Sequence, residues 1–124
     1  MESANFGIGG LRRIAVVGNS MSPTYNEGDW LLTSWWPAGL STSLTRGLMG
    51  RAVLVQRAGQ SGELDFLQIK RIKEIEPVEF GLPRFWVEGD NSAASTDSRH
   101  WGWLEAHEIK GAVMVRYRKG KKKR

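Results

Sequence analysis

The sequence contains no cysteine, which excludes disulfide frameworks, thiolate metal sites and a cysteine nucleophile. Only two histidines are present, His100 and His107, and each stands alone near the C-terminus, so no metal site is indicated. A catalytic triad that uses histidine is not excluded by this count, but no motif surrounds either residue. We therefore expect a protein that needs neither a metal nor another cofactor.

Long apolar runs are also lacking. No stretch approaches the ~18–20 consecutive apolar residues that a transmembrane helix requires. The segment 1–10 has neither the basic start nor the apolar centre of a secretory signal. The sequence therefore predicts a cytoplasmic protein with no transmembrane segment.

The composition is that of a globular protein. Of the 124 residues, 40% are hydrophobic and 25% are charged, which argues against wholesale disorder. The 15 glycines and the many short apolar runs favour a β-rich architecture with frequent turns. We expect one domain, with a loose lead-in over residues 1–10, a folded part over 11–117 and a basic tail over 118–124.

The net charge of +5 is concentrated at the C-terminus, where seven of the last nine residues are Lys or Arg. Two interpretations of this tail remain open. It can be a solvated, disordered segment, as most charge runs are. Alternatively, it attracts anionic lipid or nucleic acid, at about 1 kcal/mol per basic residue near a membrane surface.

Short β-branched and aromatic runs, separated by turn signals, predict a mostly-β fold with few or no helices. In the longest run, the period of two places Leu67 and Ile69 on one side of a strand, with Gln68 and Lys70 on the other. The expected strands cover residues 14–17, 30–36, 52–57, 64–75, 85–88 and 109–117.

The first candidate for chemistry is Ser20, within the sequence Gly-Asn-Ser-Met-Ser-Pro-Thr of residues 18–24. A serine that follows a glycine-containing turn can present its hydroxyl outside the strand. Its backbone N–H can then face the position where a substrate carbonyl develops negative charge. Serines in such turns are more often simple turn formers, so this segment alone is a weak indication.

A serine hydroxyl needs a base to become a nucleophile, and Lys70 is the candidate. A lysine can serve if its pKa falls from about 10.4 to ~7–8, and burial among apolar neighbours lowers the pKa in that direction. Lys70 lies within the most apolar predicted strand, next to Ile69 and Ile72. The alternative is that its side chain points to solvent from a half-buried strand, as most strand lysines do.

The third segment, residues 89–99, is dense in small hydroxyl and acidic residues. Such a run can fold on itself through side-chain-to-backbone hydrogen bonds. Asp97 and Arg99 can pair, and Ser95 can contact a buried amine. An ordinary surface loop held by turns of the same residue types is the competing interpretation.

Together these segments resemble the motifs of the S26 peptidases, the signal peptidase I family, which use a serine–lysine dyad. The family's nucleophile motif corresponds to residues 18–24 here, with Gly-Asp following at 28–29. Its Ile-Lys-Arg strand corresponds to residues 69–71. Its last motif corresponds to Gly-Asp-Asn at 89–91, Ser-Thr-Asp-Ser-Arg at 95–99 and Trp-Gly at 101–102. The resemblance covers about residues 14–117.

The resemblance implies a role for each matching residue. Ser20 would attack the scissile carbonyl and Lys70 would act as the general base. Ser95 would orient the lysine amine, while Asp97 and Arg99 would brace its loop. The three neighbours of the nucleophile expected to contact substrate are Gly18, Asn19 and Met21.

The implied function is a serine endopeptidase that cleaves a precursor or leader peptide after small residues. The substrate would lie in a shallow groove as an added strand. Residues 86–99 look like the short, anchorless branch of the family described as maturation proteases of nickel-type superoxide dismutase. Signal peptide processing with a membrane-anchored partner is an alternative. The segment that follows Lys70 lacks the Gly-Leu-Pro-Gly-Asp sequence of signal peptidases.

Two further interpretations belong to other classes. A self-cleaving repressor of the related S24 group needs a DNA-binding domain before the nucleophile, for which the segment preceding Ser20 leaves no room. A non-catalytic β module that binds nucleic acid through its basic tail is the disfavoured alternative, because it explains none of the three motifs.

The chain contains six tryptophans, three of them at positions 30, 35 and 36. Half of the six are expected to pack a small β core. The others could form an exposed aromatic surface, which together with the basic tail suggests peripheral contact with a membrane.

Overall fold

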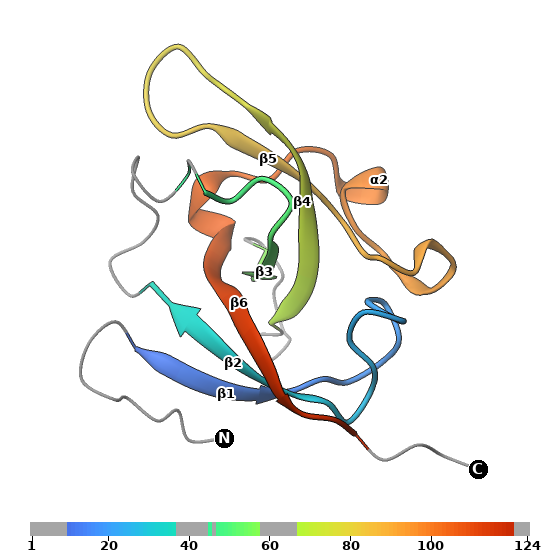
Figure 1. Ribbon diagram of the computed structural model, residues 1–124. Coiled ribbons are helices and arrows are strands. Elements are labelled where there is room, and N and C mark those ends of the chain that lie inside the picture. The colour runs from blue at the N-terminus through green and yellow to red at the C-terminus, as the bar shows by residue number, and fades with distance from the viewer. Residues whose placement is uncertain (1–9, 37–44, 46, 58–66, 121–124) are drawn as a thin grey trace.

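The computed structural model describes residues 10–36, 45, 47–57 and 67–120 (Figure 1). Its strands form one antiparallel sheet in the order β1-β2-β6-β3-β4-β5, which confirms the mostly-β prediction. The six strands are β1 (Leu11–Ala15), β2 (Trp30–Trp35), β3 (Ala52–Val55), β4 (Gln68–Glu76), β5 (Arg84–Glu88) and β6 (Ile109–Arg118).

The expected strand positions agree with the sheet, apart from their ends. β4 begins at residue 68 where the sequence predicted 64, and residues 64–66 of that prediction lie outside the described residues. β1 spans 11–15 where the sequence predicted 14–17. Its start is charged because β1 is an edge strand, and edge strands tolerate arginine. Of the expected lead-in, residues 1–9 lie outside the described residues, and the tail is described only as far as Gly120.

The helices whose bounds lie within the described residues are short turns, in keeping with the expected mostly-β fold. Two are 3₁₀ turns, η1 (Ser92–Ala94) and η2 (Ala106–Glu108), and one is the single-turn helix α2 (Ser98–Trp101). The carboxylate of Asp97 caps α2 by accepting a hydrogen bond from the Arg99 backbone. No described helix is long and apolar enough to span a membrane.

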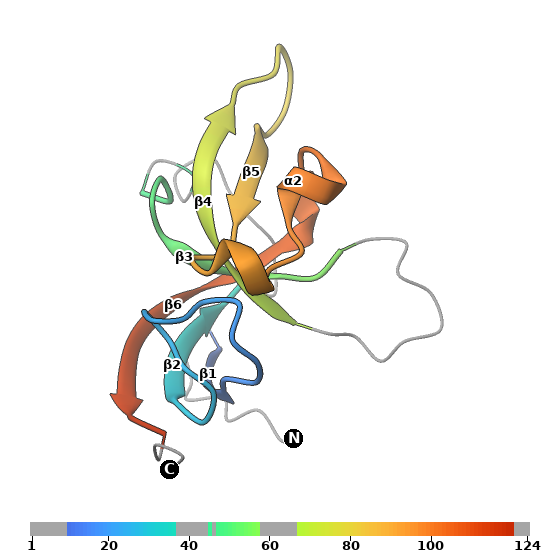
Figure 2. The ribbon, with the colours of Figure 1, turned by 90° about the vertical axis from the view of Figure 1, so that its right-hand side faces the viewer.

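Strand β6 joins the two halves of the twisted sheet (Figure 2). It pairs with β2 along most of its length and with β3 near its start. Gly111 lies where β6 meets β2, and a side chain there would collide with the carbonyl oxygen of Ser34. The close approach of the two strands therefore requires glycine.

Two apolar clusters hold the fold together. The larger one includes Val53, Ile72 and Phe85. The second includes Met21, Leu31 and Leu54 and lies beneath the loop that carries Ser20. Because adjacent residues of β3 contribute to different clusters, both faces of this central strand are buried.

The tryptophans do not form the exposed aromatic surface that the sequence suggested. All six are half-buried. Trp36 and Trp101 pack against the larger cluster and Trp35 packs against the second. Trp86 and Trp103 contact each other edge to face, with 5.4 Å between their ring centres.

The β4–β5 hairpin extends away from the body of the molecule (Figures 1 and 2). Phe80, in the connection between its strands, is 85% exposed, whereas the ring of Phe85 on β5 is completely buried. These two phenylalanines are five positions apart but differ in burial, so a comparison of their substitutions isolates the contribution of core packing to stability.

Phe85→Ala is expected to lower the free energy of unfolding by about 3–5 kcal/mol, because it removes a buried ring and leaves a cavity. Phe80→Ala is the matched control and should change stability by less than about 0.5 kcal/mol. Urea denaturation followed by tryptophan fluorescence measures both. Equal losses for the two variants would contradict this description of the core.

Candidate active site

Ser20 lies on a loop of residues 16–29, here called the Ser20 loop, which connects β1 to β2. Two backbone hydrogen bonds close its base: Val16 N–H to Asp29 O at 2.8 Å and Gly28 N–H to Val16 O at 2.9 Å. Gly18 has φ of 85°, a conformation that favours glycine, and it turns the chain before Ser20. The loop therefore presents Ser20 outside the sheet, as the sequence predicted.

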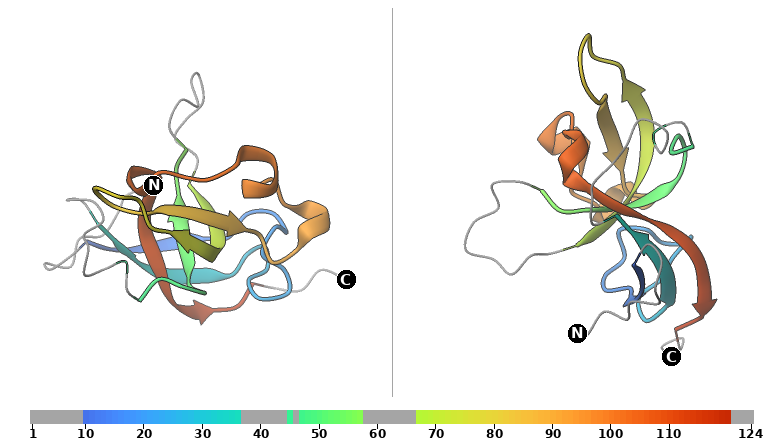
Figure 3. Two further views of the ribbon diagram at one scale, coloured as in Figure 1. Left: turned by 90° about the horizontal axis from the view of Figure 1, so that it is seen from above. Right: turned by 90° about the vertical axis from the view of Figure 1, so that its left-hand side faces the viewer.

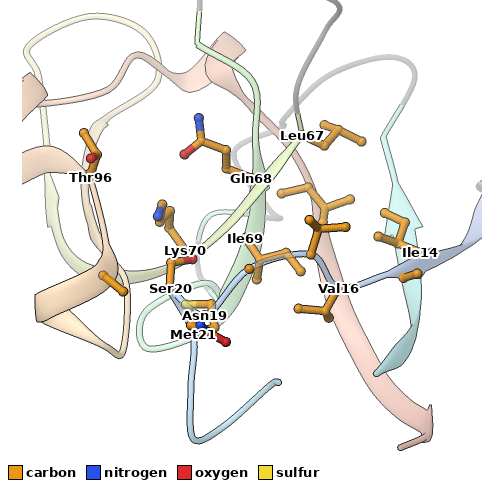
Figure 4. A pocket seen from close by; sticks show the side chains of 15 residues that line it. Ile14, Val16, Asn19, Ser20, Met21, Leu67, Gln68, Ile69, Lys70 and Thr96 are labelled. Carbon is orange, nitrogen blue, oxygen red and sulfur yellow. The ribbon is translucent and has the colours of Figure 1, made fainter. Parts of the chain in front are cut away.

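The Ser20 side chain is half-buried and lines a pocket of about 530 Å³. Figure 4 shows both Ser20 and Lys70 among the side chains that line this pocket, Ser20 from the loop and Lys70 from β4. Neither the hydroxyl nor the backbone N–H of Ser20 makes a hydrogen bond with another described residue. Both groups are therefore available to a ligand that enters the pocket.

Lys70 comes from β4, where it pairs with Val53 of β3. Its side chain is only 3% exposed, so the alternative of a solvent-facing lysine is wrong. Burial lowers the pKa of the Lys70 amine below its ordinary value, and the charge of Arg99 adds to this effect. The charge of Asp97 opposes it but does not cancel it.

Ser95 connects the amine to Asp97. Lys70 Nζ donates a hydrogen bond to Ser95 Oγ at 3.0 Å, and Ser95 Oγ donates in turn to Asp97 Oδ2 at 2.6 Å. An ionised carboxylate can only accept, so the single hydroxyl proton of Ser95 belongs to the bond with Asp97. Ser95 must then accept from Lys70. This direction leaves the lone pair of a neutral Lys70 amine free for another proton donor.

Asp97 is fully buried and has several donors. Its carboxylate accepts from the Gly89 backbone at 2.8 Å and from the Arg99 guanidinium at 2.9 and 2.6 Å. Burial by itself would raise the pKa of this carboxyl, but the hydrogen bonds from Arg99, Ser95 and the backbone hold the pKa well below its usual range. The contacts of Asp97 with Arg99 and with the Gly89 backbone therefore hold this segment together.

Gly89 is a part of the site that the sequence did not single out. A Cβ atom at this position would lie 2.7 Å from the Ser20 carbonyl oxygen and would also collide with the side chain of Ser95. Only glycine lets the Ser20 loop and Ser95 approach from both sides. In the sequence, only its position in the Gly-Asp-Asn motif of residues 89–91 could have indicated this role.

The sequence analysis also did not predict the ion pair between Arg71 and Asp90. The guanidinium of Arg71 makes two hydrogen bonds to the Asp90 carboxylate, at 2.9 and 2.7 Å. Their contact lowers the pKa of the Asp90 carboxyl and raises that of Arg71. Asp90 N–H contacts Met21 Sδ at 3.4 Å, so this ion pair links β4 to the Ser20 loop.

The three residues predicted to contact substrate all line the pocket. Gly18 and Asn19 lie at its surface, whereas Met21 is 2% exposed and belongs to the apolar cluster below. The Asn19 carbonyl accepts a hydrogen bond from the Asn91 side chain at 3.0 Å, and the Ser20 carbonyl accepts from the Asn91 backbone at 2.9 Å. Figures 2 and 3 show the Ser20 loop beside the η1 turn that follows Asn91.

The rest of the pocket divides into two parts. Apolar side chains of β1, β3 and β4 line most of it, whereas Gln68 and Thr96 lie at the opposite end (Figure 4). Within the described part of the chain, no group of three or more metal-binding side chains occurs. The arrangement can therefore remove a proton from a hydroxyl next to an extended apolar ligand, using an amine as the base.

A known protein family matches the chain. The family model described as signal peptidase, peptidase S26, matches residues 50–118, more than half of the chain. The matched part contains Lys70 and the Ser95–Arg99 segment, whereas Ser20 lies before it. No curated protein matches the chain.

Replacing Lys70 by methionine should change how stability depends on pH. Between the lowered pKa of folded Lys70 and the ordinary value near 10.4, the unfolded chain binds more protons than the folded chain. The stability of the wild type therefore rises with pH in this window, by at most about 1.4 kcal/mol per pH unit. Lys70→Met should lose this rise.

Urea denaturation from about pH 6 to about pH 10 measures the effect. Lys73→Met is the matched control, because Lys73 is an exposed lysine of the same strand. Parallel pH curves for the wild type and Lys70→Met would show that the Lys70 amine is not held neutral by the fold.

Proposed function

Because the chain belongs to the signal peptidase, peptidase S26 family, we propose that it is a serine endopeptidase with Ser20 as nucleophile and Lys70 as general base. The observation that carries the proposal is the buried Lys70 amine, which shares a pocket with the Ser20 hydroxyl. Family membership supports peptidase activity in general. The Ser20 hydroxyl, which is unpaired among the described residues, and the buried Lys70 amine both line the pocket and support the choice of these two residues.

In the proposed reaction, Ser20 Oγ attacks the scissile carbonyl carbon while its proton passes to the lone pair of Lys70. The protonated amine then gives this proton to the leaving nitrogen as the C–N bond breaks, which forms an ester with Ser20. A water molecule attacks the ester, and Lys70 accepts its proton. Lys70 finally returns a proton to Ser20 Oγ as the acid product leaves.

Negative charge on the carbonyl oxygen needs hydrogen-bond donors. The free backbone N–H of Ser20 is the donor that the loop offers at this position. Position 18 is glycine and supplies no side-chain hydroxyl. A second donor would be another backbone N–H of the same turn or a group that reaches the carbonyl oxygen only when the substrate is bound.

Two strand edges that have no partner strand among the described residues favour an extended peptide as substrate. β1 is an edge strand of the sheet, and β4 pairs with β5 only from Arg71 onward. The pocket is lined by residues 14–17, which cover the end of β1 and the start of the Ser20 loop, and by Leu67 with the first three residues of β4. A peptide strand between them could form backbone hydrogen bonds on both sides, while the apolar walls accept small side chains.

The identity of the precursor is a finer proposal. The resemblance of residues 86–99 to maturation proteases of nickel-type superoxide dismutase makes the N-terminal extension of such a precursor one candidate. A signal peptide presented by a membrane-anchored partner is the alternative. Both share an extended segment with small residues before the cleaved bond.

A specific surface supports peripheral contact with an anionic membrane as a second property. Strand register places Arg13, Leu32 and Val115 in one row on the outer face of β1-β2-β6. A neighbouring row contains Ala15, Trp30 and Arg118. Each row combines apolar side chains with an arginine and has no acidic residue, and the basic tail follows from the same strand.

Cleavage of a peptide with small residues before the scissile bond tests the proposed reaction. Ser20→Ala and Lys70→Ala should each lower kcat by at least about 10³-fold, because each removes one half of the dyad. Activity of the wild type should rise with pH as the neutral form of Lys70 accumulates through its lowered pKa.

The controls are Ser92→Ala and Lys73→Ala, which replace exposed residues of the same types. Both should retain the activity of the wild type. If Ser20→Ala or Lys70→Ala cleaves as fast as its control, the assigned dyad is wrong.

Co-sedimentation with lipid vesicles tests the membrane surface. The wild type should sediment with phosphatidylglycerol vesicles but not with phosphatidylcholine vesicles. Arg13→Glu should reduce binding several-fold, whereas Lys73→Glu, with the same change of charge on β4, should not. Equal reduction by the two variants would mean that only net charge matters, and retention of an oligonucleotide but no vesicle would favour nucleic acid instead.

A further inference from the structure

The Ser20 loop is held at two places, and only one of them belongs to the lysine side of the site. Its tip is fixed to Asn91, which donates to the carbonyl oxygens of Asn19 and Ser20. Its base contacts the end of β6 instead.

The contact at the base is centred on Asp29. This carboxylate is only 3% exposed and accepts from donors of both segments. Asn26 N–H of the loop lies 2.8 Å from Oδ2, and Gly120 N–H, just beyond β6, lies 2.7 Å from Oδ1. The Arg116 guanidinium lies 3.4 Å from Oδ2.

These donors decide the charge of Asp29. Burial would raise the pKa of its carboxyl, but the two backbone N–H groups and Arg116 lower it below the ordinary value. An ionised carboxylate, buried and shared between loop and strand, therefore ties residues 16–29 to the end of β6. Removing either group of donors would leave a buried charge undersatisfied.

The chain beyond Arg116 also lies directly against the loop backbone. Arg116 donates to the Thr24 carbonyl at 3.1 Å. At Gly120, a Cβ atom would lie 2.6 Å from the Glu27 carbonyl oxygen and 2.6 Å from the Gly28 carbonyl carbon. Only glycine allows this approach.

The lysine side of the site has no part in these contacts. Lys70, Ser95 and Asp97 are held by β4 and by the segment around α2, and none of their hydrogen bonds with described residues involves residues 116–120. A change at the end of β6 can therefore move Ser20 without altering the surroundings of the Lys70 amine. Displacements of about 1 Å between reacting groups can lower a rate by about 10²-fold.

We propose that residues 116–120 act as a strap that positions Ser20 against Lys70, with Asp29 as the positioning residue through which the strap holds the loop. The kinetic consequence of this proposal, a change in the rate of peptide cleavage, rests on the proposed peptidase function. Its structural consequence, a loop whose rigidity depends on Gly120, stands independently. Neither Asp29 nor the strap touches the reacting atoms.

Two truncations form a matched pair. A chain that ends at Gly120 keeps the strap, whereas a chain that ends at Arg118 loses the Gly120 N–H that binds Asp29. The longer chain should cleave peptide at the rate of the full chain. The shorter chain should lose about 10²-fold in kcat, with an unchanged midpoint of the pH–activity profile because Lys70 keeps its neighbours.

Equal kcat for the two truncations would overturn the proposal. A lower kcat with a shifted pH midpoint would also overturn it, because the effect would then pass through Lys70. If the shorter chain unfolds, Asp29→Asn takes its place, since the amide keeps the shape of the side chain and removes the charge.

Amide hydrogen exchange tests the strap independently of catalysis. If no form of the protein cleaves peptide, that result counts against the proposed function alone. In the shorter chain, or in Asp29→Asn, the amides of residues 19–25 should exchange faster while those of β4 keep their protection. Unchanged exchange at 19–25 overturns the strap. Equal acceleration at β4 does so too, because it would show a general loss of stability.

Discussion

The hydrogen bond from Lys70 to Ser95 is the interaction on which the rest of the site depends. It satisfies the amine inside the protein at a position where water has little access. It also fixes which way the amine can act, because Ser95 has already given its proton to Asp97. A buried lysine without such a partner would be costly, and one paired directly with a carboxylate would be held in its charged form.

The surrounding fold can be understood as the set of contacts that this arrangement requires. The pairing of β4 with β3 places the amine against apolar residues of the central strand. Asp97 is kept ionised by Arg99 and by backbone donors, so it accepts from Ser95 instead of taking the proton of Lys70. Gly89 then leaves space for Ser95 and Ser20 to approach each other.

The nucleophile side is built separately. The family match begins at residue 50 and therefore supports the lysine side of the site, while the position of Ser20 rests on the geometry of its loop. That loop is irregular, and it depends on tertiary contacts with Asn91 at one end and with the end of β6 at the other. The reactive geometry thus requires both halves of the sheet to be in place.

Local patterns in the sequence predicted much of the architecture. Strands such as β2 and β6 begin where β-branched and aromatic runs begin. The contact between Lys70 and Ser95 was implied only by the resemblance to a known family. Contacts between distant segments could not be predicted in this way. Arg116 and Asp29 are 87 positions apart, and their contact depends on how β6 crosses the sheet.

The burial of Lys70 shows the same limit. Periodicity gave the side of the strand on which it lies, but not whether that side faces water. Its burial depends on tertiary contacts such as the hydrogen bond between the Lys70 amine and Ser95, which is 25 positions away in the sequence. Likewise, the clustered tryptophans proved half-buried because neighbouring strands and arginines cover them, as Arg12 covers Trp35 at 4.0 Å.

The most direct test of the central claim is the titration of the Lys70 amine itself, followed by NMR at the ε carbon in protein with labelled lysines. The signal is assigned by its absence in Lys70→Met. The account predicts that the pKa of this signal lies below the ordinary value of a lysine amine, because burial disfavours the charged form. Titration together with the exposed lysines would contradict the account, since Lys70 would then be a charged side chain unable to accept the proton of Ser20.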